Sequence, residues 1–105
     1  MNLAAIGQFW ARWQPDATAI RWAGSDISWS ELDARTDALA AGLAERGITH
    51  GDRIAILAGN CPQWCDVSVA AWKLGAVIVP VNTRCTATEV AYVVADAGAS
   101  MLVVD

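Results

Sequence analysis

The feature that most constrains the fold is a strand–turn–helix pattern that occurs twice and is followed by a third strand. Apolar runs lie at 53–58, 77–81 and 101–104, and helix-like segments at 62–74 and about 86–97 separate them. Continuous apolar strands that alternate with helices are typical of a parallel sheet whose two faces are covered by helices. The sequence therefore predicts an α/β fold built on a parallel βαβαβ unit.

A helix and a small hairpin are predicted ahead of this unit. Leu3, Ile6, Trp10 and Trp13 share one face of a helix over 2–13, and we expect that face to dock on the core. A membrane-surface role is the alternative, but Arg12 is the one cation on this helix, which suits anionic lipids poorly. Strands at 18–23 and 27–29, joined by a Gly-Ser-Asp turn, predict the hairpin.

The next predicted helix runs from Ser30 to the residue before Gly47, which favours a left-handed helix end. Ser30 and Asp33 have the spacing of a capping box. The periodicity predicts a buried stripe and a solvent face that includes the paired acids Asp33 and Asp37. The stripe consists of Leu32, Leu39, Ala40 and Leu43, and Arg35, Asp37, Glu45 and Arg46 belong to the solvent side.

The helix over 62–74 is apolar almost all round, so we expect it to be largely buried, partly against a neighbour outside this chain. Its one polar stripe is Gln63, Asp66 and Lys73. Asn60 and Gln63 have capping-box spacing at its start. Thr86 and Glu89 predict a capping box for the last helix, which ends at Gly98, and Pro80 indicates a strand end or an edge strand.

Length and composition limit the classes of protein to which the chain can belong. The chain has 105 residues, enough for one domain, and we treat 1–105 as a single, partial domain. The net charge is −4 and the seven basic residues are scattered, which argues against nucleic-acid binding. The odd count of three cysteines and the lack of a signal-like start favour reduced thiols and a cytoplasmic location, with no metal site and no membrane-spanning segment.

Two loops are predicted at the carboxyl ends of the strands, where open parallel sheets bind ligands. They are 59–61 and 82–85, and each leads into a helix N-terminus that favours anions. Asn82, Thr83 and Arg84 are the cofactor-binding candidates, since a guanidinium suits phosphate or carboxylate. In the alternative interpretation, Asn60 and Thr86 only cap helices and Arg84 lies on the surface.

No residue is assigned a catalytic role. The chain contains no glycine-rich dinucleotide or P-loop motif and no nucleophile elbow. The one histidine, His50, falls in a loop. The six tryptophans are Trp10, Trp13, Trp22, Trp29, Trp64 and Trp72. They are expected at core or partly buried positions, with core packing favoured and an apolar acyl-chain pocket as the alternative.

An ordered set of short segments resembles the N-terminal part of the adenylate-forming enzymes (AMP-dependent synthetases and ligases), in the acyl-CoA synthetase branch. These segments are 27–32, 47–48, 51–56, Asn60, 73–77, 79–84, Glu89 and Asp96. The resemblance implies that a carboxylate attacks the α-phosphate of ATP, with Mg²⁺, and that coenzyme A then displaces AMP to give a thioester.

The resemblance also implies that the phosphate loop, the adenine- and magnesium-binding motifs and the catalytic lysine lie later in such enzymes. The chain is thus expected to be an incomplete piece of the large N-terminal domain, inactive alone, with no cofactor site of its own. Its partners would be the rest of the synthetase domain and a fatty or aryl acid, and a homo-oligomer is possible.

Two alternative functions remain. One is a stand-alone interaction module that uses the edge at 101–104 and the helix 62–74, and the other is a nucleotide-binding half-domain that uses Asn82 and Arg84.

Overall fold

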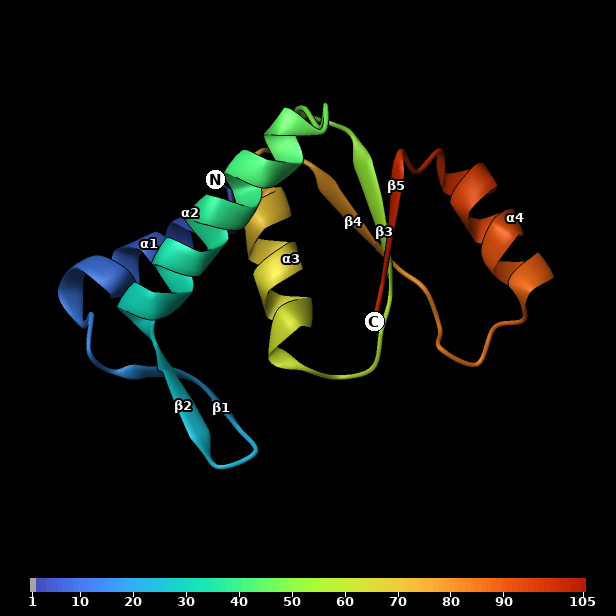
Figure 1. Cartoon of the computed structure of the whole chain (residues 1–105). Coiled ribbons are helices and arrows are strands. Elements are labelled where there is room, and N and C mark those ends of the chain that lie inside the picture. The colour runs from blue at the N-terminus through green and yellow to red at the C-terminus, as the bar shows by residue number, and fades with distance from the viewer. Residues whose placement is uncertain (1) are drawn as a thin grey trace.

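The computed structural model describes residues 2–105 and forms four helices and five strands within that range. Figure 1 shows their arrangement. In chain order the elements are α1 (Ala4–Trp13), β1 (Thr18–Trp22), β2 (Ser25–Ser28), α2 (Trp29–Glu45), β3 (Arg53–Leu57), α3 (Pro62–Lys73), β4 (Val77–Pro80), α4 (Ala87–Ala97) and β5 (Met101–Val104).

The predicted parallel unit is confirmed. The strand order is β4-β3-β5, and both neighbours run parallel to β3, with Ile54 opposite Ile78 on one side and Met101 on the other. Ile54 and Ala55 in the central strand are 0% exposed. The edge position expected for the strand that contains Pro80 is also confirmed, and β1 and β2 form the predicted antiparallel hairpin.

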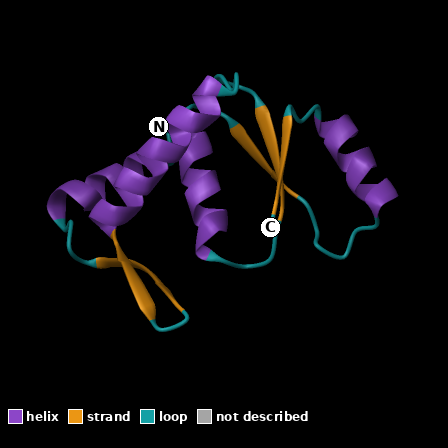
Figure 2. Ribbon diagram, viewed as in Figure 1, coloured by secondary structure: helices purple, strands orange, loops and turns teal. Residues whose placement is uncertain are grey.

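The elements form layers on the two sides of the sheet (Figure 2). Helix α3 covers one face, and α2 and α1 lie beyond α3 on that side. The main hydrophobic cluster fills the space between α2, α3 and the sheet, where Leu43, Ile54, Ala70 and Ala71 meet. Helix α4 lies on the opposite side of the sheet and contains no buried residue.

Helix α2 begins earlier than the sequence pattern predicts. Ser28 is the N-cap, and its Oγ accepts a hydrogen bond of 3.1 Å from the backbone N–H of Glu31. Our assignment of Ser30 and Asp33 as a capping pair was therefore wrong. The cap is Ser28 because it ends strand β2 in extended backbone, and a capping residue needs that conformation.

The expected cap of α3 is also wrong. Cys61, not Asn60, is the N-cap residue, and it makes no side-chain capping hydrogen bond. Pro62 follows at the first helical position, where its fixed φ favours the helix start. The Thr86–Glu89 capping box of α4 is present in both directions, and Gly98 closes α4 in a left-handed conformation with φ 65°.

Two members of the predicted polar stripe of α3, Asp66 and Lys73, form ion pairs with α2, whereas Gln63 is exposed. The Nζ of Lys73 lies 2.8 Å from Asp33 Oδ1 and 2.6 Å from Asp37 Oδ1, and the Lys73 side chain is only 7% exposed. Arg35 pairs with Asp66, which is buried. Asp33 and Asp37 thus serve as counterions for Lys73, which corrects the prediction that they only solvate a helix face.

Helix α1 docks through its small residues, so the expected core face was wrong. Ala4 is buried, whereas Leu3, Ile6, Trp10 and Trp13 are exposed, Trp13 by 64%. Ala4 and Gly7 form a second stripe at helical spacing, and Ala4 is the residue of that stripe that is buried. Trp22 is exposed as well, which is contrary to the prediction, whereas Trp29, Trp64 and Trp72 are partly buried as expected.

We expect Lys73→Met to lower the free energy of unfolding by about 2 kcal/mol, because two carboxylates then lose their shared cation at a partly buried helix interface. Arg21→Met is the matched control. Arg21 pairs with Asp26 in the hairpin, where the two side chains are 76% and 48% exposed, and we expect a much smaller loss because solvent screens this pair. Urea unfolding measures both, and equal losses would contradict the assigned role of Lys73.

The same interaction predicts a pH dependence. Burial acts to lower the pKa of Lys73, but hydrogen bonds to Asp33 and Asp37 outweigh it and raise the pKa above its ordinary value of 10.5. Because the pKa of Lys73 is higher in the folded than in the unfolded state, its charged form stabilises the fold. This contribution is complete at pH values below the pKa of the unfolded state, and it is lost as the pH rises through the pKa of the folded state. The stability difference between the parent chain and Lys73→Met should therefore shrink above pH 10.5, and a constant difference in urea titrations would refute this.

Candidate functional site

The candidate site is the edge of the sheet where the three parallel strands end. The loop after β3 leads into α3, the loop after β4 leads into α4, and β5 ends beside them at Asp105 (Figure 1). The two loops singled out from the sequence, 59–61 and 82–85, therefore do lie at the carboxyl ends of their strands.

The loop 82–85 is a tight turn organised by Asn82. The Oδ1 of Asn82 accepts a hydrogen bond of 2.9 Å from the backbone N–H of Arg84, and the carbonyl of Asn82 accepts one of 3.0 Å from the N–H of Cys85. Such a turn is the usual structural use of asparagine. The side-chain oxygen of Asn82 already accepts this hydrogen bond within the loop.

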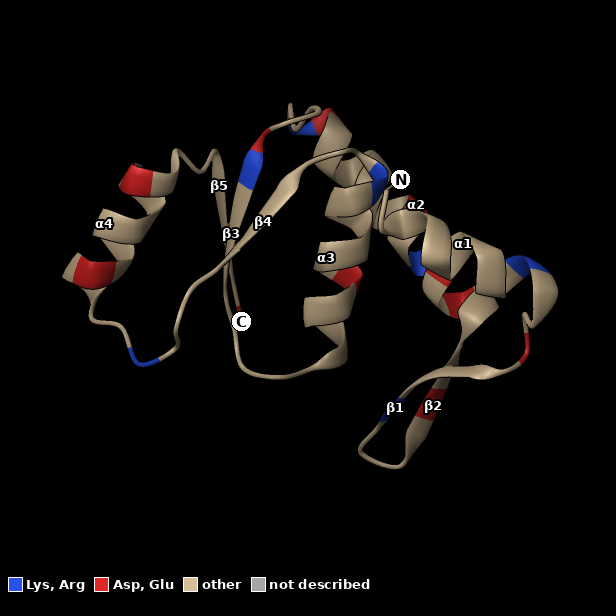
Figure 3. Cartoon of the chain, turned by 180° about the vertical axis from the view of Figure 1, so that it is seen from behind, with Lys and Arg blue, Asp and Glu red and all other residues tan. Residues whose placement is uncertain are grey.

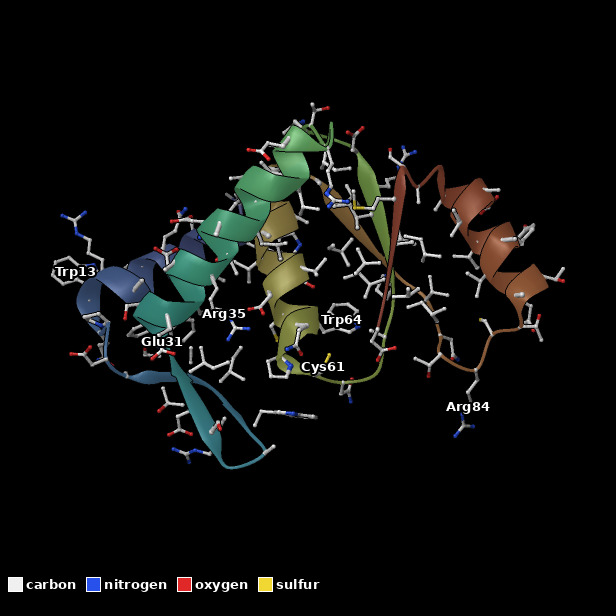
Figure 4. All side chains as sticks on the ribbon, in the orientation of Figure 1. Trp13, Glu31, Arg35, Cys61, Trp64 and Arg84 are labelled. Atoms are coloured by element: carbon white, nitrogen blue, oxygen red, sulfur yellow. The ribbon has the colours of Figure 1, made fainter. Side chains whose placement is uncertain are left out.

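Arg84 and Thr83 are exposed on the same turn. Figure 4 shows the Arg84 side chain directed away from the sheet. None of the salt bridges within residues 2–105 involves Arg84. Its guanidinium is thus available to an anion that approaches from outside the described residues.

The two helix N-termini at this edge differ. At α4 the Glu89 carboxylate accepts a hydrogen bond of 3.3 Å from the Thr86 N–H, and Thr86 Oγ1 accepts one of 3.2 Å from the Glu89 N–H. This acidic residue therefore sits where an anion would have to bind. On α4, Glu89 and Asp96 are the charged residues and both are acidic, as Figure 3 shows. The N-terminus of α3 lacks a side-chain cap.

Sequence reasoning missed the contribution of Asp105. Its Oδ2 accepts a hydrogen bond of 3.2 Å from the backbone N–H of Gly59, which ties the loop after β3 to the end of β5. Beside it lies a pocket of about 330 Å³, whose walls include Trp64, Val67 and Val103. Apart from Asp105 no charged residue lines this pocket, so it suits an apolar group, and Arg84 is not among its walls.

The Cys65 thiol has little nucleophilic character. Cys61, Cys65 and Cys85 are all free. Partial burial, followed by the nearby Asp66 and Cys61, raises the pKa of the Cys65 thiol, which keeps it protonated at neutral pH. Within residues 2–105 no group of three or more His, Cys, Asp or Glu side chains could hold a metal ion, and no helix there is long and apolar enough to span a membrane.

Comparison with known proteins identifies the family. The family of AMP-binding enzymes matches residues 8–105, so the chain belongs to this family. A feruloyl-CoA synthase from Amycolatopsis sp is 41% identical over 93 residues, which cover 89% of this chain and 19% of the relative. The long-chain-fatty-acid–CoA ligase FadD13 from Mycobacterium tuberculosis is 36% identical over 77 residues, covering 73% of this chain and 15% of that protein.

Solved structures agree with this assignment. The N-terminal subdomain of NpsA from Klebsiella oxytoca is 31% identical and superposes with a TM-score of 0.92, over 99% of this chain and 27% of that one. A fatty acyl CoA synthetase from Mycobacterium tuberculosis is 30% identical and superposes with a TM-score of 0.93. The match covers 98% of this chain and 21% of that one. The predicted resemblance to the N-terminal segment of an adenylate-forming enzyme is confirmed.

The chain spans about a fifth or less of the length of the curated relatives described above. The candidate site described here therefore covers only the residues that this segment supplies. In the family comparison, these are the opening strands and helices of an α/β domain.

Proposed function

We propose that this chain is the N-terminal part of an ATP-dependent acyl-CoA synthetase and that it is inactive alone. The observation that carries the proposal is the 41% identity with feruloyl-CoA synthase over 89% of the chain. In such an enzyme a carboxylate attacks the α-phosphate of ATP and releases pyrophosphate. The thiol of coenzyme A then attacks the acyl-adenylate and releases AMP, and the enzyme stabilises the charge that develops on the phosphates.

The contribution of residues 1–105 to this reaction is a framework, within one partial domain. The exposure of Leu102 and Val104 on strand β5 and the absence of buried residues in α4 support this proposal, because further strands and helices would cover them. The substrates would be a fatty or aryl acid, ATP with Mg²⁺ and coenzyme A, in the cytoplasm, where these cofactors occur.

Asn82, Thr83 and Arg84 are the proposed cofactor-contacting residues of this segment. Arg84 is exposed beyond the carboxyl end of β4 and has no ion-pair partner among residues 2–105. A guanidinium in that position can pair with phosphate oxygens in a forked geometry. Asn82 would position Arg84 through the turn that its side chain closes.

The alternative of a stand-alone interaction module finds less support. It relied on the helix 62–74 as a free apolar surface, whereas Ala70 and Ala71 of that helix are completely buried within this chain. The edge strand β5 remains exposed, so only half of that binding surface is present.

Replacing the matching segment of the Amycolatopsis feruloyl-CoA synthase with this chain should give a hybrid that forms feruloyl-CoA from ferulate, ATP and coenzyme A. The chain alone should release no pyrophosphate. We expect the hybrid to be active because this segment is similar to the one it replaces, and the relative supplies the catalytic motifs that lie later in the chain. Pyrophosphate release and thioester formation measure both. Acyl-adenylate formation by the 105-residue chain, or a folded hybrid without activity, would contradict the proposal.

In that hybrid, Arg84→Ala should raise the KM for ATP on the order of ten-fold, because a charge-assisted hydrogen bond to phosphate is worth about 1.5–3 kcal/mol. Arg46→Ala is the matched control, since Arg46 is equally exposed but lies at the C-cap of α2, away from the carboxyl ends of the strands. Steady-state kinetics at varied ATP separate the two, and an unchanged KM in Arg84→Ala would remove Arg84 from the cofactor site.

A further inference from the structure

A second pocket lies where α1, β1, α2 and α3 meet, away from the carboxyl edge of the sheet. Its volume is about 350 Å³, and its walls include Ile6, Ile20, Trp29, Val69 and Trp72. All of the residues that line it belong to these elements of this chain or to the turn that precedes α1. It opens to solvent beside Ile6, which is 50% exposed.

The walls of this pocket are apolar and uncharged. No Asp, Glu, Lys, Arg or His lines it, and the one thiol, Cys65, stays protonated because its pKa is raised. The half-buried rings of Trp29 and Trp72 offer aromatic surface, and Trp29 is stacked on Trp10 with ring centroids 6.3 Å apart. Offset stacking on such rings favours aromatic guests, and uncharged walls disfavour anionic ones.

Gly7 keeps this pocket open. It lies inside α1, where glycine costs about 1 kcal/mol relative to alanine. Its backbone does not have a positive φ, and a Cβ built on it would meet nothing within 4 Å. Neither backbone conformation nor close packing therefore requires glycine here. The missing side chain instead leaves space in the wall of the pocket.

We propose that this pocket binds a small neutral aromatic molecule. A dry apolar cavity of about 150 Å³ accepts benzene, so about twice that volume accommodates a substituted ring or a bicyclic one. A partner helix, about 10 Å across, would not fit. The site is distinct from the proposed synthetase site and does not depend on that function, because the carboxylate substrate of a synthetase carries the charge that these walls disfavour.

The test is a titration of the 105-residue chain with toluene and with indole, followed by the ¹³C-methyl NMR signals of its isoleucines. The expected result is a saturable shift at Ile6 and Ile20, with a Kd on the order of 1 mM for toluene, and no shift at Ile54 and Ile56 in the central strand. Benzoate, which adds a carboxylate to the same ring, should bind at least about five-fold more weakly.

Gly7→Leu should fill the pocket and weaken toluene binding at least about ten-fold, and Gly7→Ala should weaken it less. Gly42→Leu is the matched control, because Gly42 is also a helix-interior glycine with nothing within 4 Å of a built Cβ, and it does not line the pocket. Gly42→Leu should bind toluene like the parent chain.

Several outcomes would overturn the proposal. Shifts confined to Ile78 of the edge strand β4 would place the ligand elsewhere, and benzoate binding as tight as toluene binding would refute the assigned chemistry. Unchanged affinity in a folded Gly7→Leu variant would exclude this pocket. A parent chain without dispersed methyl signals would refute the claim that these residues build the pocket by themselves.

Discussion

The central strand β3 supports the rest of the structure. It is paired on both sides, with β4 and with β5, and its residues Ile54, Ala55 and Ile56 are almost completely removed from water. Both neighbouring strands form their parallel hydrogen bonds with β3, and α3 packs over it through Ala70 and Ala71. Small residues on the helix let it approach the sheet closely. The sheet is thus organised around a strand whose three middle residues have almost no solvent contact.

Stabilising interactions are unevenly distributed around that strand. On one face, α2 and α3 combine apolar packing with ion pairs, in which the Lys73 ammonium satisfies two carboxylates of α2. On the other face, α4 buries no residue. Because apolar burial dominates folding free energy, the α2–α3 side carries most of the stability of this chain. The candidate site at the carboxyl edge lies between these two unequal halves.

The sequence determined the sheet well, because an uncharged apolar run such as 54–58 has few alternatives to a buried strand. The helix faces were harder to predict. Helix α1 has two stripes at helical spacing, one of large apolar residues and one that contains Ala4 and Gly7, and hydrophobicity alone ranks the wrong one first. Asp33 and Asp37 were placed on the solvent face because a charged residue at a helix interface can be predicted only when its counterion, here Lys73 on a helix distant in sequence, is known. The hydrogen bond between Asp105 and Gly59 likewise joins residues far apart in the chain.

Helix α4 secures its own ends. The capping box of Thr86 and Glu89 satisfies backbone donors at its start, and Gly98 turns the chain at its end, although no tertiary contact buries any of its residues. Its ends are therefore defined locally, and a hydrogen bond of 3.0 Å that Arg53 Nη1 donates to the Ala97 carbonyl joins its C-terminal end to β3. A partner surface that docks on α4 need not nucleate a helix at the same time, so the entropic cost of ordering those residues does not weaken the association.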